Sequence, residues 1–500
     1  MKKIAFITLS FLAVTTLSAQ ELKIPSDTQI VTNHTATIAN KSINYKATAG
    51  MQPLWDKAGK PIATLSYAYY ERTNGEKAGQ RPIIFSFNGG PGSASVWMHL
   101  AYTGPKILNI DDEGYPVQPY GFKDNPYSIL DVADIVFIDP VNTGYSRMIA
   151  DKEGKMPDSK QFFGINADIK YLAEWMNTFV TRNSRWESPK YIIGESYGGT
   201  RVMGLAAELQ NSQWMYLNGV IMVSPADYRV LRNGSPISDA LYLPYFTAAA
   251  WYHEVLPQDL QSKDLLEILP EVEAYSINTL MPALAKGSMI KAEEKDAVAE
   301  KMAYYSGLSK EVVLQHHLRV PNSFFWKELL RDESGHTIGR LDSRYLGIDK
   351  FEAGGRTDYN PELSSWLHSF TPAINHYMKN ELKFETDVKY NVFGDVRPWD
   401  LSNDNVREDL RSAMAENPFL HVMTQSGYYD GATTYSSAKY SLSQIDPSGK
   451  MQDRISFKGY RSGHMMYLRK EDLIKSNDDL REFIKLSSPK GAPAKYKRNK

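Results

Sequence analysis

The sequence predicts an α/β fold, in which a mostly parallel central sheet is flanked by helices and interrupted by a large helical insertion. Short apolar runs of β-branched and aromatic residues, typical of strands buried on both faces of a parallel sheet, occur at 82–87, 134–138, 190–193 and 219–223. Apolar residues at helical spacing predict a helix over 165–180, between the second and third runs. Strands that alternate with helices in this way indicate an α/β core.

The remaining elements follow in chain order. Alternating side chains predict antiparallel strands within 42–49 and 62–70, at the start of a first core part over 20–238. Residues 239–400 contain segments rich in Glu, Lys, Ala and Leu, and they predict a helical cap insertion with helices such as 271–280 and 291–305. The second core part, 401–487, is expected to hold a helix near 406–415 and strands at 420–424 and 454–457.

Residues 1–19 predict a cleavable secretory signal. Lys2 and Lys3 precede an apolar run over 4–17, and the small residues Ser18 and Ala19 follow it. A retained anchor is the alternative, but the run is shorter than the roughly 20 residues that a membrane-crossing helix needs. We therefore expect an exported protein, periplasmic or extracellular, with no membrane span after cleavage.

The composition of the chain limits the partners that it can attract by charge and the chemistry that its side chains can perform. The formal net charge of the 500 residues is −1, which provides no general attraction to nucleic acid or acidic membranes. The basic segment 488–500 contains Pro, Gly and Ala and is expected to be a solvated tail. The absence of cysteine excludes disulfides, thiolate catalysis and cysteine-bound zinc. We expect no metal, cofactor or nucleic-acid partner.

A nucleophile motif follows the third apolar run. Residues 191–199 read YIIGESYGG, an apolar strand that leads into Gly194-Glu195-Ser196-Tyr197-Gly198. This is the nucleophile-elbow pattern, in which a tight turn with flanking glycines lifts a serine hydroxyl above the sheet. An ordinary strand-to-helix turn is the alternative. The buried strand before the motif and the helix-compatible residues 200–209 behind it favour Ser196 as a nucleophile.

A glycine-rich turn follows the first apolar run. Residues 85–92 read FSFNGGPG. Acyl transfer needs backbone N–H donors aimed at the oxygen that becomes negative, and such a turn supplies one while the residue after the nucleophile, Tyr197, supplies the other. By itself the segment is equally compatible with a plain Gly-Pro turn, so the prediction depends on the elbow downstream.

A serine nucleophile needs a base and an orienting acid, which follow it in the order acid, then histidine. Only His421 and His464, of ten histidines, lie in the resumed core. His421 begins a predicted strand and favours a structural role, whereas His464 lies in a loop after the final strand. Asp430 follows a strand and a glycine, and we predict that it orients His464.

Together these motifs resemble the serine carboxypeptidase family of the α/β-hydrolase superfamily. The resemblance rests on an Asn-Gly-Gly-Pro-Gly turn, a Gly-Pro pair, an Asn-Pro-Tyr-Ser segment, a Pro-x-x-x-Gly-aromatic-Ser loop, the elbow, and the aspartate and Gly-His-Met segments, at 88–92, 104–105, 125–128, 140–146, 194–199, 430 and 463–465. It implies a fold of that superfamily and an exopeptidase acting on peptides or proteins with free C-termini. It further implies that Asn88, Gly89 and Glu195 bind the substrate carboxylate and that Gly90 joins Tyr197 as oxyanion donor.

One position departs from the family pattern. Family members usually carry a Glu two residues before the Gly-Pro pair, where it shares a proton with the elbow Glu, and this chain has Tyr102 there. We expect Tyr102 to help bind the substrate, either through a carboxylate contact altered toward its hydroxyl or through a shifted pH optimum. A hydrogen bond from this phenol to Glu195 would lower the pKa of Glu195.

The sequence therefore predicts an exported serine carboxypeptidase that works through Ser196, His464 and Asp430 and an acyl-enzyme. Another α/β-hydrolase acyl chemistry, in an esterase, an acyltransferase or another exopeptidase, is the alternative, since one triad serves several reactions. Asn88 and Glu195 argue against it, because attack on an ester needs neither. A non-catalytic binding protein on the same scaffold would predict a broken triad, and all three members are present.

Overall fold

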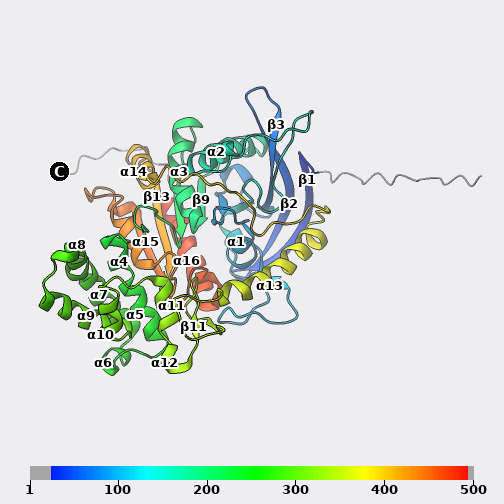
Figure 1. Ribbon diagram of the computed structural model, residues 1–500. Helices are drawn as coiled ribbons and strands as arrows, with labels where there is room; N and C mark the ends of the chain where they lie inside the picture. Colours follow the sequence, from blue (N-terminus) through cyan, green and yellow to red (C-terminus); the bar gives the residue numbers. More distant parts are fainter. Residues whose placement is uncertain (1–23, 233, 492, 494–500) are drawn as a thin grey trace, which may run out of the picture.

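The computed structural model describes residues 24–232, 234–491 and 493 (Figure 1). The predicted signal over 1–19 lies outside these residues, as does most of the predicted tail over 488–500. Among the helices of the described part, none is long and apolar enough to cross a membrane.

A ten-stranded sheet forms the centre of the molecule, with the order β1-β2-β3-β7-β4-β9-β10-β13-β14 and β8 paired to β3. The first three strands and β8 are antiparallel to their neighbours. They are β1 (Thr28–Ile38), β2 (Lys41–Trp55), β3 (Pro61–Arg72) and β8 (Arg147–Met148). The other six run parallel. They are β4 (Ile83–Phe87), β7 (Asp134–Ile138), β9 (Lys190–Glu195), β10 (Gly219–Val223), β13 (His421–Gly427) and β14 (Ile455–Tyr460).

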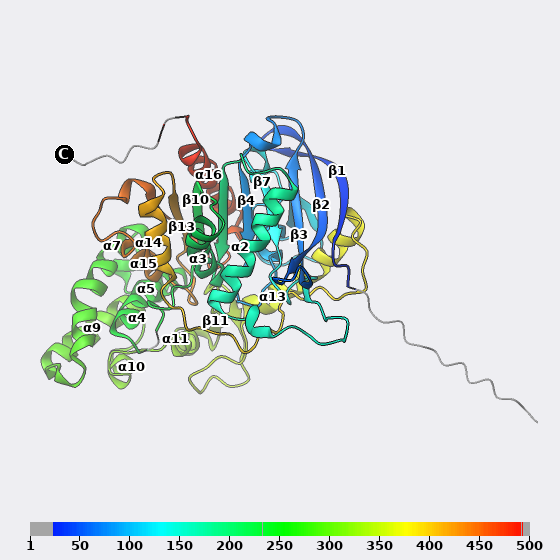
Figure 2. The same ribbon diagram turned by 90° about the horizontal axis from the view of Figure 1, so that it is seen from above.

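Helices cover both faces of the sheet. The strands β4, β7, β9 and β10 are therefore buried on both sides. One apolar cluster joins a face to α2 (Ile165–Arg182), α3 (Tyr197–Ser212) and α14 (Val406–Glu416), and Figure 2 shows α2 and α3 against the strands. A second cluster joins the opposite face to α1 (Val96–Ala101), α13 (Pro361–His376) and α16 (Lys470–Ser487). Helix α15 (Tyr435–Ser443) contacts β13 and β14, and β5 (Lys106–Leu108) pairs with β6 (Phe122–Asp124).

Two parts of the predicted insertion 239–400 pack differently. The first is a helical lobe with its own apolar core, drawn in green in Figure 1. Its helices are α4 (Pro236–Leu241), α5 (Leu243–Tyr252), α6 (Gln258–Gln261), α7 (Leu265–Tyr275), α8 (Met281–Lys286), α9 (Ala292–Ser306), α10 (Lys310–Gln315), α11 (Asn322–Glu328) and α12 (Arg331–Ser334). The second part begins with β11 (Thr337–Ile338) and β12 (Leu346–Gly347), and it returns along the sheet, where residues such as Trp366 and Val392 join the core of the α/β part.

The structure confirms the predicted mostly parallel sheet and its elements, with boundaries that differ by a few residues. The predicted helices 165–180 and 291–305 are α2 and α9, and the predicted helix 271–280 overlaps the end of α7 and a π turn at Ser276–Leu280. All six parallel strands point their carboxyl ends toward one edge, so the loops after β4, β9 and β13 meet there. That edge contains the residues from which a site was predicted.

Candidate active site

Ser196 lies in a sharp turn between β9 and α3, at the carboxyl edge of the sheet. Its backbone has φ 60° and ψ −123°, a conformation that residues other than glycine rarely adopt. The N–H of Ser196 donates to the carbonyl of Val223, and its carbonyl accepts from Gly199 and Ala226, each at 2.9 Å. These bonds hold the strained residue in place. Its side chain is partly exposed while Glu195 and Tyr197 are buried.

The glycine-rich turn packs directly on this elbow. A Cβ atom at Gly89 would lie 2.5 Å from the amide nitrogen of Tyr197 and 2.6 Å from the carbonyl oxygen of Glu195, so glycine is required there. Gly90 has φ +106°, in the region that favours glycine. The backbones around Gly90 and Tyr197 therefore lie side by side, as an oxyanion hole shared between turn and elbow requires.

A buried ion pair also connects the glycine-rich turn and the elbow. The guanidinium of Arg201, on α3, contacts Asp168 at 2.7 Å and donates to the carbonyl of Asn88 at 2.6 Å. The hydroxyl of Tyr197 also donates to Asp168, at 3.2 Å. Arg201 and Asp168 are both fully buried, and each has its partners. Turn and elbow are thus connected by side chains as well as by backbone contact.

His464 and Asp430 contact each other in the described structure. His464 Nδ1 lies 2.7 Å from Asp430 Oδ2, and both side chains are buried. Asp430 also accepts from the backbone of Ala432 and from both the backbone and hydroxyl of Thr433, at 2.8 to 3.1 Å. A carboxylate held this way can only accept from the histidine, so Nδ1 carries the proton and Nε2 is free to act as a base.

The free nitrogen of His464 faces the elbow. Its Nε2 lies 3.8 Å from Oε1 of Glu195, the residue before Ser196. Burial lowers the pKa of His464, but Asp430 and Glu195 outweigh it and raise the pKa above its ordinary value, while Arg340 acts in the opposite direction.

Glu195 is buried and hydrogen-bonded through a single oxygen. Its Oε2 accepts from Asn88 Nδ2 at 2.9 Å and from the hydroxyl of Tyr467. Burial raises the pKa of Glu195 to about 7, while His464, Tyr467 and Asn88 oppose that rise. Because two donors already occupy Oε2, the proton of the neutral acid belongs on Oε1, the oxygen nearer His464.

The hydrogen bond from Tyr102 to Glu195 that the Glu-to-Tyr replacement would allow is not formed. The Tyr102 hydroxyl donates to Gln425 Oε1 at 2.6 Å, and its ring stacks on Tyr467 at 4.7 Å between centroids. The lower pKa of Glu195 that such a bond would cause is not found either, because burial dominates and raises that pKa. The phenol that reaches Glu195 is that of Tyr467, three residues after His464, a residue that no sequence motif marks.

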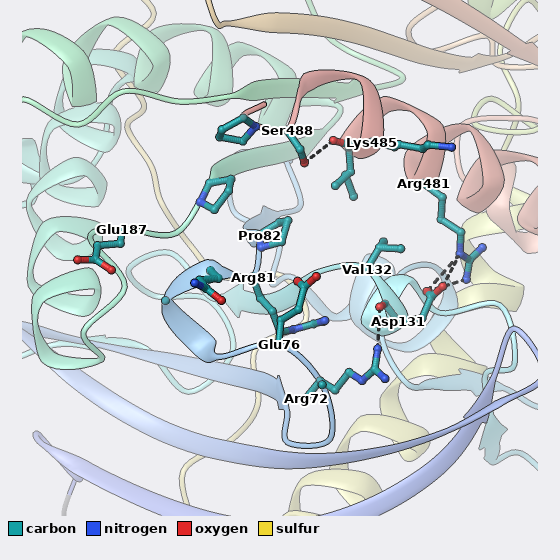
Figure 3. A pocket seen from close by; sticks show the side chains of 16 residues that line it. Arg72, Glu76, Arg81, Pro82, Asp131, Val132, Glu187, Arg481, Lys485 and Ser488 are labelled. Atoms are coloured by element: carbon teal, nitrogen blue, oxygen red, sulfur yellow. Dashed lines mark hydrogen bonds and ion pairs between the residues drawn. The ribbon is translucent and has the colours of Figure 1, made fainter. Parts of the chain in front are cut away.

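The cavity in Figure 3 lies at the opposite edge of the sheet and is not the site described here. Its volume is about 790 Å³, and its wall includes Pro82 and Pro189, which precede β4 and β9. Charged side chains in it form contacts with one another, such as Arg481 with Asp131 at 3.1 Å. Ligands of open α/β sheets bind outside the carboxyl ends of the strands, where Ser196 lies.

The described residues contain no group of three or more His, Asp or Glu side chains that could hold a metal ion.

Comparison with known proteins identifies the family. The serine carboxypeptidase family model matches residues 40–316, more than half of the chain. Serine carboxypeptidase-like 36 of Arabidopsis thaliana is 28% identical over 178 residues, which cover 35% of this chain and 34% of that protein. The pheromone-processing carboxypeptidase KEX1 of Saccharomyces cerevisiae is 29% identical over 151 residues, or 29% of this chain and 20% of that protein. The matches thus span 34% and 20% of the length of these two relatives.

A solved structure supports the fold. The prohormone-processing carboxypeptidase KEX1 of Saccharomyces cerevisiae superposes with a TM-score of 0.55 at 16% identity, covering 88% of this chain and 91% of that one. At this identity the likeness shows the fold alone, and it agrees with the predicted α/β-hydrolase architecture. On the family match over residues 40–316, the chain belongs to the serine carboxypeptidase family.

Proposed function

We propose that the protein is a serine carboxypeptidase that hydrolyses C-terminal peptide bonds through Ser196, His464 and Asp430. The observation that supports this most directly is the 2.7 Å contact between His464 Nδ1 and Asp430 Oδ2, with Nε2 turned toward the elbow. Family membership supports the same reaction.

The proposed reaction has two halves. In acylation, the Ser196 hydroxyl attacks the scissile carbonyl while His464 Nε2 takes its proton, and Asp430 stabilises the imidazolium. The backbone N–H groups of Gly90 and Tyr197 donate to the resulting oxyanion. The imidazolium then protonates the leaving amine, and the C-terminal residue departs. In deacylation, His464 activates water, which releases the shortened peptide and restores Ser196.

We propose that Asn88, Gly89 and Glu195 bind the free carboxylate of the substrate. A neutral Glu195 would donate its Oε1 proton to that carboxylate, whereas an ionised Glu195 would repel it. Since burial raises the pKa of Glu195 to about 7, KM should rise as the pH increases above that value. Since the pKa of His464 is raised, kcat should fall on the acid side. Together they predict a bell-shaped dependence of kcat/KM on pH.

A pair of matched substrates tests the proposal. A blocked dipeptide with a free C-terminus should be cleaved, while its C-terminal amide should be cleaved at least about tenfold more slowly, because it lacks the charge that the site recognises. Ser196→Ala should abolish cleavage and labelling by a fluorophosphonate, with His421→Gln as a histidine control that leaves both intact. Equal cleavage of acid and amide, or a preference for a simple ester, would instead indicate another α/β-hydrolase acyl chemistry.

We also propose that the protein is exported, on the pattern of residues 2–19. Sequencing the N-terminus of the mature protein tests this, and a start at Gln20 is expected. An N-terminus that still contains residues 1–19 in the mature protein would contradict cleavage.

A further inference from the structure

The acid loop and the histidine loop meet on a short segment of the insertion, residues 340–344, here called the strap. It lies between β11 and β12, far in sequence from both loops. The acid loop contributes residues 429–431 and the histidine loop residues 462–464. Hydrogen bonds connect each of the two loops to the strap.

The strap binds the acid loop on both sides of Asp430. The carbonyl of Arg340 accepts from the N–H of Gly431 at 3.0 Å. The N–H of Ser343 donates to the carbonyl of Tyr429, also at 3.0 Å. The residues that flank Asp430 are therefore both fixed to the strap.

The strap also binds the histidine loop at three successive residues. The N–H of His464 donates to the carbonyl of Leu341 at 2.6 Å. The N–H of Gly463 donates to Asp342 Oδ2 at 3.3 Å, and the Ser462 hydroxyl accepts from Arg344 Nη2 at 3.1 Å. A Cβ atom at Gly463 would lie 2.5 Å from the Leu341 carbonyl oxygen, so the two segments are in close contact.

A buried ion pair shapes the strap itself. Arg344 contacts Asp342 through two nitrogens, at 2.7 and 3.0 Å, and both side chains are at most 2% exposed. A planar guanidinium that grips a carboxylate with two bonds fixes geometry as well as charge. The pair sets the positions of Asp342 and Arg344, the two side chains that hold Gly463 and Ser462.

We propose that the strap positions His464 against Asp430, with Asp342 and Arg344 as its positioning pair. Neither residue contacts the atoms that react, so their effect reaches the reaction through the two loops. This inference rests on the proposed function of the triad. It assigns to the insertion a part in catalysis: the insertion contributes the surface on which acid and base are assembled.

Removing the pair as a unit gives the sharpest test. Asp342→Leu with Arg344→Met replaces both charges by apolar groups of similar size, so that neither charge is left buried alone. We expect kcat to fall about 10- to 100-fold, since a shift of about 1 Å in a catalytic group has that effect, with KM within about twofold of wild type. Arg344→Lys, which keeps the charge but not the paired bonds, should recover part of the loss.

The chain offers a matched control. Lys327 and Asp349 form another ion pair of the insertion, at 2.6 Å with side chains at most 2% exposed. Their further hydrogen bonds go to the carbonyl of Phe351 and the N–H of Asp358 rather than to the acid loop or the histidine loop. Lys327→Met with Asp349→Leu removes an equally buried pair and should leave kcat unchanged. Ser462→Ala, which deletes one strap contact without touching a charge, should lower kcat less than the double variant.

A proton NMR measurement separates this inference from the proposed function. The Nδ1 proton shared between His464 and Asp430 should give a low-field resonance in wild type, assigned by its loss in His464→Gln. We expect it to broaden or vanish in the Asp342→Leu and Arg344→Met double variant and to persist in the Lys327 and Asp349 control. The acid limb of kcat should move to lower pH in the same variant, because Asp430 no longer raises the pKa of His464 as strongly.

An unchanged resonance together with wild-type kcat in the strap variant, or equal losses in the strap and control variants, would overturn the positioning role. If wild type cleaves no peptide, the proposed function fails, but the resonance still decides whether the strap holds His464 against Asp430.

Discussion

Around Ser196 the chain packs closely against the glycine-rich turn and the neighbouring strand, whereas the segments around Asp430 and His464 also depend on hydrogen bonds to the strap, which is distant in sequence from both. At the elbow, a Cβ atom at Gly194 would lie 2.0 Å from the carbonyl oxygen of Gly198, so the geometry tolerates no added atom. At the acid and base, the loops rest on the strap through bonds that can be removed one at a time.

This difference between the surroundings of Ser196 and those of Asp430 and His464 fits the roles proposed for the two halves of the site. The proposed nucleophile and oxyanion donors belong to backbone that cannot rearrange without steric clash, which suits a site that stabilises charge by fixed dipoles. In the proposed mechanism His464 exchanges protons with several partners in turn, so its orientation is what the strap must maintain. Substitutions around Asp430 and His464, the acid–base half of the site, should therefore lower kcat alone. Substitutions in the glycine-rich turn should also raise KM.

The largest expected effect is in the acid–base half. Asp430→Asn should lower kcat by about 10³- to 10⁴-fold, because an amide can favour the wrong tautomer of His464, while KM changes little. Steady-state kinetics on a blocked dipeptide measures both values, with His421→Gln as the control. A comparable rise in KM would break the proposed division between the two halves.

The next effect concerns the turn. Gly89→Ala places a Cβ atom 2.5 Å from the Tyr197 amide nitrogen, which should push the turn off the elbow. We expect kcat to fall about 10²- to 10³-fold, as when an oxyanion donor is lost, and KM to rise as well. The free energy of unfolding should fall by about 1–3 kcal/mol, measured by chemical denaturation.

Gly121→Ala is the matched control for the turn, because a Cβ atom at Gly121 meets nothing within 4 Å. Its kinetics and stability should equal those of wild type. A Gly89→Ala enzyme with normal kcat and KM would show that the turn has room to move, contrary to the comparison.

A smaller effect is expected at Tyr467. Tyr467→Phe removes one donor to Glu195 but keeps the ring that stacks on Tyr102. Because that donor lowers the pKa of Glu195, its loss should raise the pKa further and keep Glu195 neutral at higher pH. The rise of KM should then begin at higher pH, and kcat/KM at pH 8 should increase by up to about tenfold. A shift of KM toward lower pH would contradict this role.

The smallest effect is expected at Tyr102. Tyr102→Phe leaves the Glu195 contacts intact and deprives Gln425 of a donor. The free energy of unfolding should fall by about 1–3 kcal/mol, the cost of an unsatisfied buried acceptor, while the pH profile should stay that of wild type. A profile altered as in Tyr467→Phe would show that Tyr102 controls Glu195 after all.

Much of the site could be predicted because its signals are local. The strain at Ser196 and the glycines beside it arise within a few residues, so the elbow can be identified from a pentapeptide. The pairing of His464 with Asp430 followed from their order and from their loops after core strands, and the structure places them 2.7 Å apart.

Other features had no local signal. Tyr467 reaches Glu195 across a separation of 272 residues, and nothing around Tyr467 marks it as a partner. Tyr102 was expected at Glu195 because of its place in a family pattern, but its hydroxyl points to Gln425. The strap lies in the insertion, whose helical composition predicts no contact with the catalytic loops.

The amino-acid sequence by itself determined the parallel sheet, the strained elbow, the glycine turn and the choice of Ser196, His464 and Asp430 as the residues proposed to react. These depend on short-range sterics and on the burial of apolar runs, which any stretch of chain expresses locally. Only the tertiary structure decided which phenol reaches Glu195 and which segment holds His464 against Asp430. Those pairings depend on side chains from distant segments meeting in one buried place, where each donor must find an acceptor.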